Sequence, residues 1–390
     1  MSMNLSALEI MTKLISFPTV SRDSNLELVD WVESYLTFHG ITSTRVPNDD
    51  GTKAAIYASV GPSVEGGVVL SGHTDVVPVD GQDWDSDPFT VTERDGRYYG
   101  RGTCDMKGFD ALALWAMAQA AKAEIKRPLQ IALSYDEEIG CIGAPPMIDH
   151  MVANTNIPRA ASAIIGEPST MQAVTGHKTG IGFTVDVKGF EVHSSLMHSG
   201  VSAILESAHV LNWINETNIA LRAAPATDVA AMFDPPFTTV HSGVISGGTA
   251  ANITAADCSF TIDMRVVPDG DAAALEDALR AIAGATQTRM QAVHPDVGIE
   301  VAPFFYVPGL KPENDGVAEA LVRSITGDNG SHVVSYGTEA GQFQERGYSS
   351  VICGPGDIAQ AHQPNEFIEI SEFNAGQGFM KSLIAKLSTE

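Results

Sequence analysis

The stretch VVLSGHTD, at positions 68–75, places an apolar run directly before a histidine and an aspartate. The apolar residues are typical of a buried strand, and alternate residues of an extended chain point the same way. His73 and Asp75 therefore emerge together at the end of this strand. A metal-bound histidine needs such a partner, because a carboxylate commonly holds the ring nitrogen that does not bind the metal. A lone His-x-Asp pair usually consists of two polar residues on the surface, so the interpretation depends on the residues that end the other strands.

Strand-like and helix-like segments alternate through the first 170 residues. Apolar periodicity predicts helices over 5–15, 26–39 and 109–123, and strands over 42–46, 54–59, 67–72, 129–135 and 161–166. This alternation indicates an α/β/α fold around a mainly parallel sheet, whose binding crevice lies at the carboxyl ends of the strands.

Acidic residues follow two later strands of the predicted sheet. Glu137 and Glu138 come directly after the strand at 129–135, and Glu167 ends the strand at 161–166. All three would lie at the same sheet edge as His73. An acidic turn taken alone is most simply a solvated strand end, but its recurrence at one edge favours a functional site.

The pattern changes near residue 180, where residues begin to alternate between apolar and polar. The periodicity predicts, in order, a strand at 182–188, a helix at 201–215, strands at 238–246 and 256–266, a helix at 272–285 and a strand at 298–304. A βαββαβ order forms a compact two-layer α+β unit. We therefore predict a catalytic domain over 1–179 and 305–390, interrupted by an inserted domain over 180–304. The resumed part contains predicted helices at 315–325 and 372–387 and strands at 332–335 and 350–354.

The formal net charge of −25 narrows the choice of partners. Such a charge repels phosphate backbones and anionic lipid, so nucleic acid and membrane surfaces are unexpected partners. No apolar segment approaches the roughly 20 residues that a membrane helix needs, and the first residues lack the pattern of a secretory signal. The four cysteines are scattered and form no CxxC pair, so we expect a cytoplasmic protein without a disulfide framework.

Imidazole and carboxylate side chains are ligands that zinc and similar metals accept. Asp105 lies in the glycine-rich segment GRGTCDMKG, where it could bridge two metals; a helix cap is the alternative role for its carboxylate. Glu137 and Glu138 are adjacent, so one can bind a metal while the other stays free as a base. His362 follows a strand by eight residues and, alone, would be an ordinary loop histidine.

Five motifs together resemble the dinuclear zinc family of aminoacylases, acetylornithine deacetylases and succinyl-diaminopimelate desuccinylases. The motifs are SGHTDVVP (71–78), GRGTCDMKG (100–108), SYDEEIGCIG (134–143), IGEPS (165–169) and AHQPNE (361–366). They occur in the family's order, and the resemblance extends over nearly the whole chain. It implies two divalent metal ions, zinc or alternatively cobalt or manganese, and hydrolysis of an N-acyl amino acid.

The resemblance also implies a role for each ligand. Asp105 would bridge the two metals, and the peptide bond that follows it would be cis. His73 and Glu167 would complete one metal site, and Glu138 and His362 the other.

Two further residues of these motifs would act in catalysis. The resemblance implies that Asp75 orients His73 and that Glu137 is the general base. Glu137 would take a proton from the attacking water and return it to the leaving amine.

In the inserted domain the resemblance implies a lid through which two copies form a homodimer. KGFEVHSS (188–195) matches the segment whose histidine, His193, reaches an active site, in some members that of the partner subunit. Asn252 and Arg265 match residues that bind the anionic groups of the substrate. A surface loop histidine and a rim charge pair are the alternatives for His193 and Arg265.

The segments 72–89, 165–180 and especially 335–347 look most like the acetylornithine deacetylase branch of the family. The expected reaction is then the deacetylation of N-acetylornithine, a step of arginine biosynthesis. Glu339 could face the cationic side chain of this substrate; a surface or structural charge is the alternative role for Glu339. Alternatives are a desuccinylase, a broader aminoacylase or dipeptidase, a single-metal enzyme, and an inactive relative that serves in binding or assembly.

Overall fold

The computed structural model describes residues 3–389, and the chain divides into two compact units. The larger unit comprises residues up to Gly176, Leu310–Val333 and the residues from Thr338 onward. The inserted unit comprises His177–Gly309 and Val334–Gly337. It contains all of 180–304, extends a few residues beyond both ends, and takes in a short segment from the returning chain.

The larger unit is built on an eight-stranded sheet in the order β1-β2-β6-β3-β7-β15-β8-β14. Its strands are β1 (Ser43–Pro47), β2 (Ala54–Val60), β3 (Gly67–His73), β6 (Leu129–Ser134), β7 (Ala160–Pro168), β8 (Val174–His177), β14 (His332–Val334) and β15 (Ser349–Gly354). The four central strands, β6, β3, β7 and β15, are parallel to one another, while β1 and β2 add an antiparallel edge. The sheet is therefore mainly parallel at its centre, as the sequence predicts.

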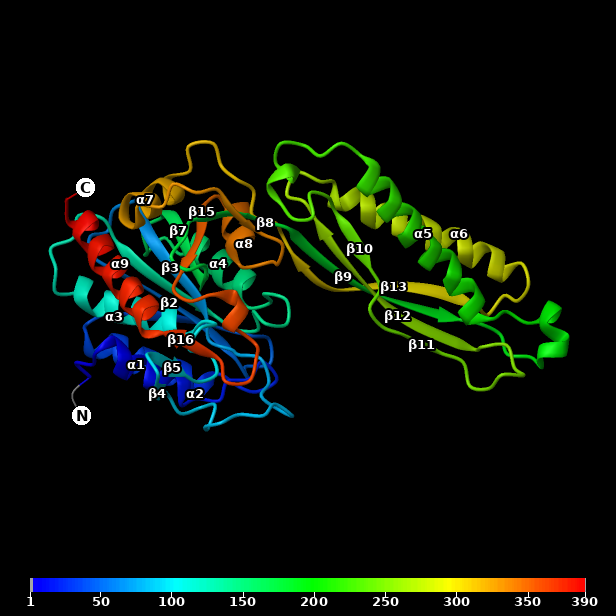
Figure 1. Ribbon diagram of the computed structural model, residues 1–390, viewed down its shortest axis with the longest axis horizontal. Coiled ribbons are helices and arrows are strands. Elements are labelled where there is room, and N and C mark those ends of the chain that lie inside the picture. The colour runs from blue at the N-terminus through cyan, green and yellow to red at the C-terminus, as the bar shows by residue number, and fades with distance from the viewer. Residues whose placement is uncertain (1–2, 390) are drawn as a thin grey trace. The chain divides into compact units, whose positions relative to one another are not determined.

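Helices cover both faces of this sheet (Figure 1). The helices are α1 (Ala7–Ile15), α2 (Leu26–Phe38), α3 (Lys107–Ala120), α4 (Ala144–Ala153), α7 (Val317–Thr326), α8 (Ala340–Glu345) and α9 (Ile370–Thr389). Helix α3 packs on β3 and β6, with α1 and α9 packed on α3. Helices α4 and α8 contact each other; α4 also contacts β2 and β6, and α8 contacts β7 and β15. The central strands are buried along nearly their whole length, because both faces carry helices. This α/β/α arrangement brings the carboxyl ends of the parallel strands to one edge.

The inserted unit is a two-layer α+β structure. Its elements are β9 (Thr179–Lys188), α5 (Ala203–Ala223), β10 (Thr239–His241), β11 (Ile245–Gly247), β12 (Asp257–Val266), α6 (Ala272–Gln291) and β13 (Gly298–Val307). The antiparallel sheet has the order β10-β12-β9-β13, with β11 also paired to β12. Alternate residues of β9 and β12 pack with α5 and α6 in one apolar core. This matches the predicted βαββαβ order, except that one predicted strand is divided in two.

Several elements differ from the sequence prediction. The strand expected at 238–246 is divided into the two short strands β10 and β11. Both pair with β12, but the pairing is interrupted between them. A small sheet of β4 (Thr92–Arg94), β5 (Arg97–Tyr99) and β16 (Phe367–Glu369) pairs segments that are far apart in sequence, which local periodicity cannot reveal. Periodicity also does not predict helices α4 and α8. Helix α8 has six residues, too few to show a helical period.

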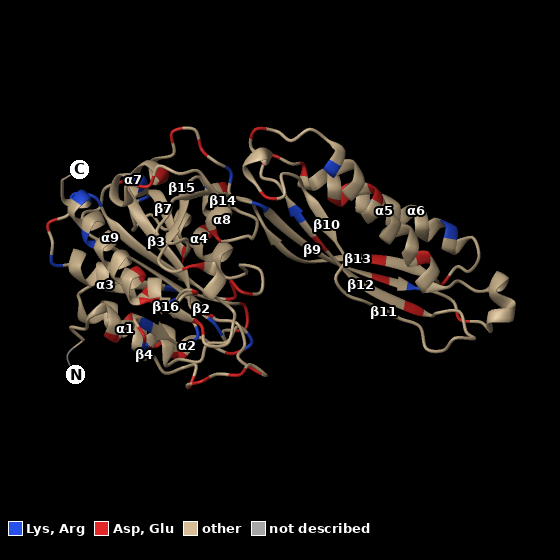
Figure 2. Cartoon of the chain, in the orientation of Figure 1, with Lys and Arg blue, Asp and Glu red and all other residues tan. Residues whose placement is uncertain are grey.

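Charge is spread over both units rather than gathered in one run. Figure 2 shows acidic positions along the loops and helices of each unit. Within the described residues, no helix combines the length and apolar character that crossing a membrane requires.

Candidate metal centre

Two groups of possible metal ligands meet at the carboxyl edge of the central strands. One group is His73, Asp105 and Glu167, and the other is Asp105, Glu138 and His362; within each group the ligand atoms lie within 4.8 Å of one another. Asp105 belongs to both groups. These five residues are the ones predicted as ligands from separate strand ends and loops, and the fold brings them together.

Asp105 stands between two histidines. Its Oδ1 lies 3.2 Å from His73 Nε2, and its Oδ2 lies 3.1 Å from His362 Nε2. His362 Nε2 is also 2.9 Å from Glu138 Oε2, and His73 Nε2 is 3.8 Å from Glu167 Oε1. One carboxylate thus presents an oxygen to each group, which is the arrangement that a bridging ligand needs.

A buried ion pair between Arg101 and Glu366 fixes the loop before α3, which carries Asp105. Glu366 Oε1 accepts hydrogen bonds from the backbone N–H groups of Gly102, Cys104 and Asp105, and its Oε2 lies 2.6 Å from Arg101 Nη1. Helix α3 begins at Lys107 without a side-chain cap, so Asp105 is not its cap. The peptide bond between Asp105 and Met106 is cis, as the resemblance implies. No role was predicted for Glu366, although it lies in the motif AHQPNE.

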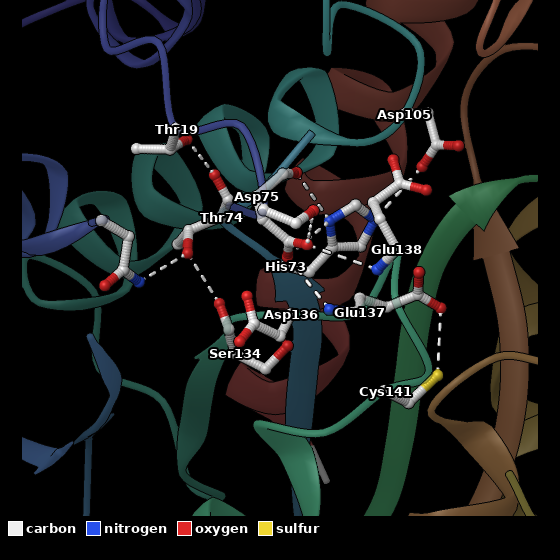
Figure 3. A network of polar contacts seen from close by, with 12 residues as sticks. Thr19, His73, Thr74, Asp75, Asp105, Ser134, Asp136, Glu137, Glu138 and Cys141 are labelled. Carbon is white, nitrogen blue, oxygen red and sulfur yellow. Dashed lines mark hydrogen bonds and ion pairs between the residues drawn. The ribbon is translucent and has the colours of Figure 1, made fainter. Parts of the chain in front are cut away.

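Asp75 contacts both His73 and the loop that follows β6, as Figure 3 shows. The nearest acceptor to His73 Nδ1 is the backbone oxygen of Asp75, at 2.9 Å, whereas the carboxylate Oδ1 is 3.5 Å away. The carboxylate accepts hydrogen bonds from the backbone N–H groups of Glu137 and Glu138, at 3.1 and 3.3 Å, and from Ser21 Oγ at 2.7 Å. The side chain of Asp75 therefore fixes the Glu137–Glu138 loop more directly than it fixes His73.

Burial and crowding raise the pKa of several carboxyl groups at this edge. The pKa of Glu137 and that of Glu138 lie above their usual value, first because both are removed from water and then because Asp105 and other acidic groups of the site are near. Burial, followed by the charges of Asp105 and Glu137, raises the pKa of Glu167 in the same way. For Asp105, burial is outweighed by hydrogen bonds from His362 and His73, which lower its pKa.

These features fit divalent cations. Among the described residues, Glu138 Oε1 is buried without a hydrogen-bond partner. A buried carboxylate oxygen without a partner is costly, and crowded carboxylates repel one another, so bound cations would relieve both penalties. The donors are imidazole nitrogens and carboxylate oxygens, which zinc and neighbouring metals accept.

Glu339 is buried, and its carboxylate is held by two serines. It is 1% exposed, and its two carboxylate oxygens accept hydrogen bonds from Ser71 and Ser134. Burial raises its pKa to about 7. Since Ser71 precedes His73 on β3 and Ser134 ends β6, Glu339 ties together the two strands beneath the candidate ligands.

The other expected substrate-binding residues belong to the inserted unit. There the segments of His193 and Asn252 run side by side, since Ser194 N–H donates to the backbone oxygen of Asn252 at 2.8 Å. His193 Nδ1 lies 2.8 Å from Ser195 Oγ. Arg265 makes two 2.9 Å hydrogen bonds to Asp263, so its guanidinium is paired within its own strand.

An α/β/α unit that gathers two carboxylate–histidine groups at its strand ends, with Glu137 beside them, defines a metal-dependent hydrolase. The model of "Peptidase family M20/M25/M40" matches residues 69–386. An acetylornithine deacetylase from Myxococcus xanthus is 34% identical over 380 residues, which cover 95% of this chain and 95% of that one. The chain belongs to the M20/M25/M40 peptidase family.

Solved structures show the same fold at lower identity. An M20 family metallo-carboxypeptidase from Sulfolobus solfataricus has a TM-score of 0.75 at 18% identity, covering 99% of this chain and 100% of that one. A dinuclear metal binding peptidase of the M20 family from Bacillus subtilis has a TM-score of 0.65 at 14% identity, with 98% of each chain covered.

Proposed function

We propose that this protein hydrolyses the acetyl amide of N-acetylornithine, releasing ornithine and acetate. The observation that carries the proposal is the sharing of Asp105 by two ligand groups, with the carboxylate of Glu137 on the same loop as Glu138. The relative from Myxococcus xanthus, which matches nearly the whole chain, is named for this activity.

We propose that the five clustered residues hold two divalent metal ions, zinc being the first expectation and cobalt or manganese alternatives. Asp105 would serve both ions, His73 and Glu167 one of them, and Glu138 and His362 the other. When bound, such ions lower the pKa of water towards neutrality and polarise an acyl carbonyl.

Glu137 would move the proton. Its carboxylate accepts a proton from the water that attacks the acyl carbon, and the C–N bond breaks as that proton passes to the amine nitrogen. A carboxylate can both take and return a proton, which is what this role requires. Asp75, through the backbone of Glu137, would keep this carboxylate in place.

The substrate carries a negative carboxylate and a positive side chain, and different parts of the protein would recognise each. Asn252 and Arg265 are the proposed contacts for the substrate's carboxylate. The net charge of −25 favours the approach of a cationic side chain such as that of ornithine. Since the oxygens of Glu339 are already paired with serines, we propose that any effect of Glu339 on a cationic substrate is a through-space one.

The proposed function is tested by release of free ornithine from N-acetylornithine. We expect turnover by the metal-loaded protein and its loss after dialysis against a chelator, with recovery when zinc, cobalt or manganese is returned. N-Succinyl-diaminopimelate, neutral N-acetyl amino acids and dipeptides form the comparison panel. A kcat/KM for any of these at least about tenfold above that for N-acetylornithine, a difference of about 1.4 kcal/mol, would reject the substrate assignment.

We propose that two copies form a homodimer through the inserted unit. Strand β13 lies at the edge of its sheet, where its backbone groups can pair with another chain. Phe304 and Tyr306 on this strand are each 52% exposed, which is unusual for large apolar side chains. His193 would then contribute to an active site, either its own subunit's or the partner's.

Mixing two inactive variants tests which site His193 serves. His193→Ala is expected to depress turnover with metal content intact, and Glu137→Gln is expected to be nearly inactive. If His193 acts on the partner's site, an exchanged heterodimer has one site with both defects and one with neither, so activity returns. Subunit exchange is followed with differently tagged chains. Exchange without recovery of activity would place His193 in its own subunit's site or outside catalysis.

A further inference from the structure

The loop from Asp136 to Gly143, which carries Glu137, is a tight turn. Its backbone hydrogen bonds fix the turn but not the direction of the Glu137 side chain. Asp136 and Cys141 both have left-handed backbone, with φ of 56° and 53°, which is uncommon for residues other than glycine. The N–H groups of Gly140 and Cys141 both donate to the backbone oxygen of Glu137, at 2.9 and 2.8 Å. These bonds close the turn but leave the Glu137 side chain free to rotate.

The thiol of Cys141 contacts that side chain directly. Cys141 Sγ lies 3.2 Å from Glu137 Oε1, and Figure 3 shows the two groups facing each other. Cys141 is 2% exposed, and burial, with the negative charge of Glu137 next, raises the pKa of its thiol well above the usual value. The sulfur therefore keeps its hydrogen and acts as a donor to the carboxylate.

Gln342 of α8 holds Cys141 from the other side. Its Nε2 donates to the backbone oxygen of Cys141 at 3.0 Å. Gln342 is 1% exposed, and among the described residues its Oε1 has no hydrogen-bond partner. An unpaired buried amide oxygen is a folding penalty that an apolar side chain would avoid. The hydrogen bond from the amide nitrogen to Cys141 offsets part of this penalty.

We infer that Gln342 and Cys141 are positioning residues for Glu137: Gln342 fixes the backbone of Cys141, and the thiol fixes the carboxylate of Glu137. Neither residue belongs to the candidate ligand groups. The inference deepens the proposed function and rests on it for the identity of Glu137 as the base.

A thiol is a weak hydrogen-bond donor, but a single such bond favours one orientation of the carboxylate over others. Its bond to Oε1 restricts the rotation of the Glu137 carboxylate and leaves Oε2 for the water.

Substitution of Cys141 tests the contact with Glu137. Cys141→Ala keeps Cβ, and with it the turn, but removes the donor; we expect kcat to fall about 3- to 10-fold, the effect of one lost hydrogen bond, with KM changed less than about twofold. Cys141→Ser should recover at least half of the loss, because a hydroxyl also donates. Cys353→Ala is the matched control, a buried cysteine of the same unit in the apolar core.

Amide hydrogen exchange tests Gln342 without any substrate. Gln342→Met removes the amide at similar size, and we expect the amides of 140–142 to exchange about tenfold faster or more. Gln344→Met is the control, since Gln344 lies on the same helix but bonds Lys311 and Glu313 instead. Metal content, measured by mass spectrometry, should match the wild type in all four variants with Ala or Met.

Three results would overturn the inference: equal kcat in Cys141→Ala and Cys353→Ala, no recovery in Cys141→Ser over Cys141→Ala, or equal exchange in Gln342→Met and Gln344→Met. If the wild type hydrolyses no N-acyl amino acid, the proposed function fails, and the exchange comparison still decides whether Gln342 holds the loop.

Discussion

Glu137→Gln is expected to lower kcat by about 10²–10⁴-fold while the protein keeps two metal ions, since general-base catalysis contributes about that much. Glutamine has the shape of glutamate and keeps the backbone N–H that donates to Asp75. It loses the negative charge and, with it, the ability to take a proton. The measurement is kcat on N-acetylornithine together with the metal content per chain.

Glu138→Gln is the matched comparison, because it removes a carboxylate from the neighbouring residue of the same loop. Glu138 Oε2 lies 2.9 Å from His362, and its Oε1 has no partner among the described residues. We expect the metal affinity of this variant to fall, while its kcat measured at saturating metal falls less. Full metal retention in Glu138→Gln combined with metal loss in Glu137→Gln would reverse the two assignments.

The strand ends of the larger unit could be predicted because their signal is local. A buried parallel strand is an uninterrupted apolar run, and the residue that ends it is read directly from the sequence. Strands β3, β6 and β7 are of this kind, so His73, the Glu137–Glu138 pair and Glu167 could be assigned to one edge from their positions in the chain. Parallel strands bring their carboxyl ends together, so the proximity of these residues in space follows from their positions at strand ends.

Other parts of the site depend on contacts between distant segments. Glu366 reaches the backbone of Asp105 across 261 positions of the chain, and no periodicity in either segment announces that contact. The same is true of Gln342 and Cys141, which are 201 residues apart. Asp75 shows a finer limit: the pattern His-x-Asp indicates a pair, but only the backbone geometry shows that its carbonyl is nearer to His73 than its carboxylate.

Asp105→Ala is expected to abolish detectable turnover and to lower the metal content of the protein. The carboxylate offers one oxygen to each ligand group, so its loss removes a ligand from both at once. Two cations held close together without a shared anion would also repel each other strongly, because the site is buried and screening by water is weak. We therefore expect the occupancy of both metal positions to fall, with fewer than two ions per chain after dialysis.

Asp110→Asn is the control for this experiment. Asp110 is a buried aspartate five positions further along, on α3, and burial raises its pKa well above the usual value, which favours the neutral form of its carboxyl group. Asparagine closely resembles that neutral form, and we expect metal content and kcat near those of the wild type. If Asp105→Ala retained wild-type turnover and two metal ions, the shared-ligand assignment would be wrong. Metal loss in Asp105→Ala but not in Asp110→Asn would tie the effect to the charged oxygens of Asp105 rather than to the loss of a buried carboxyl group.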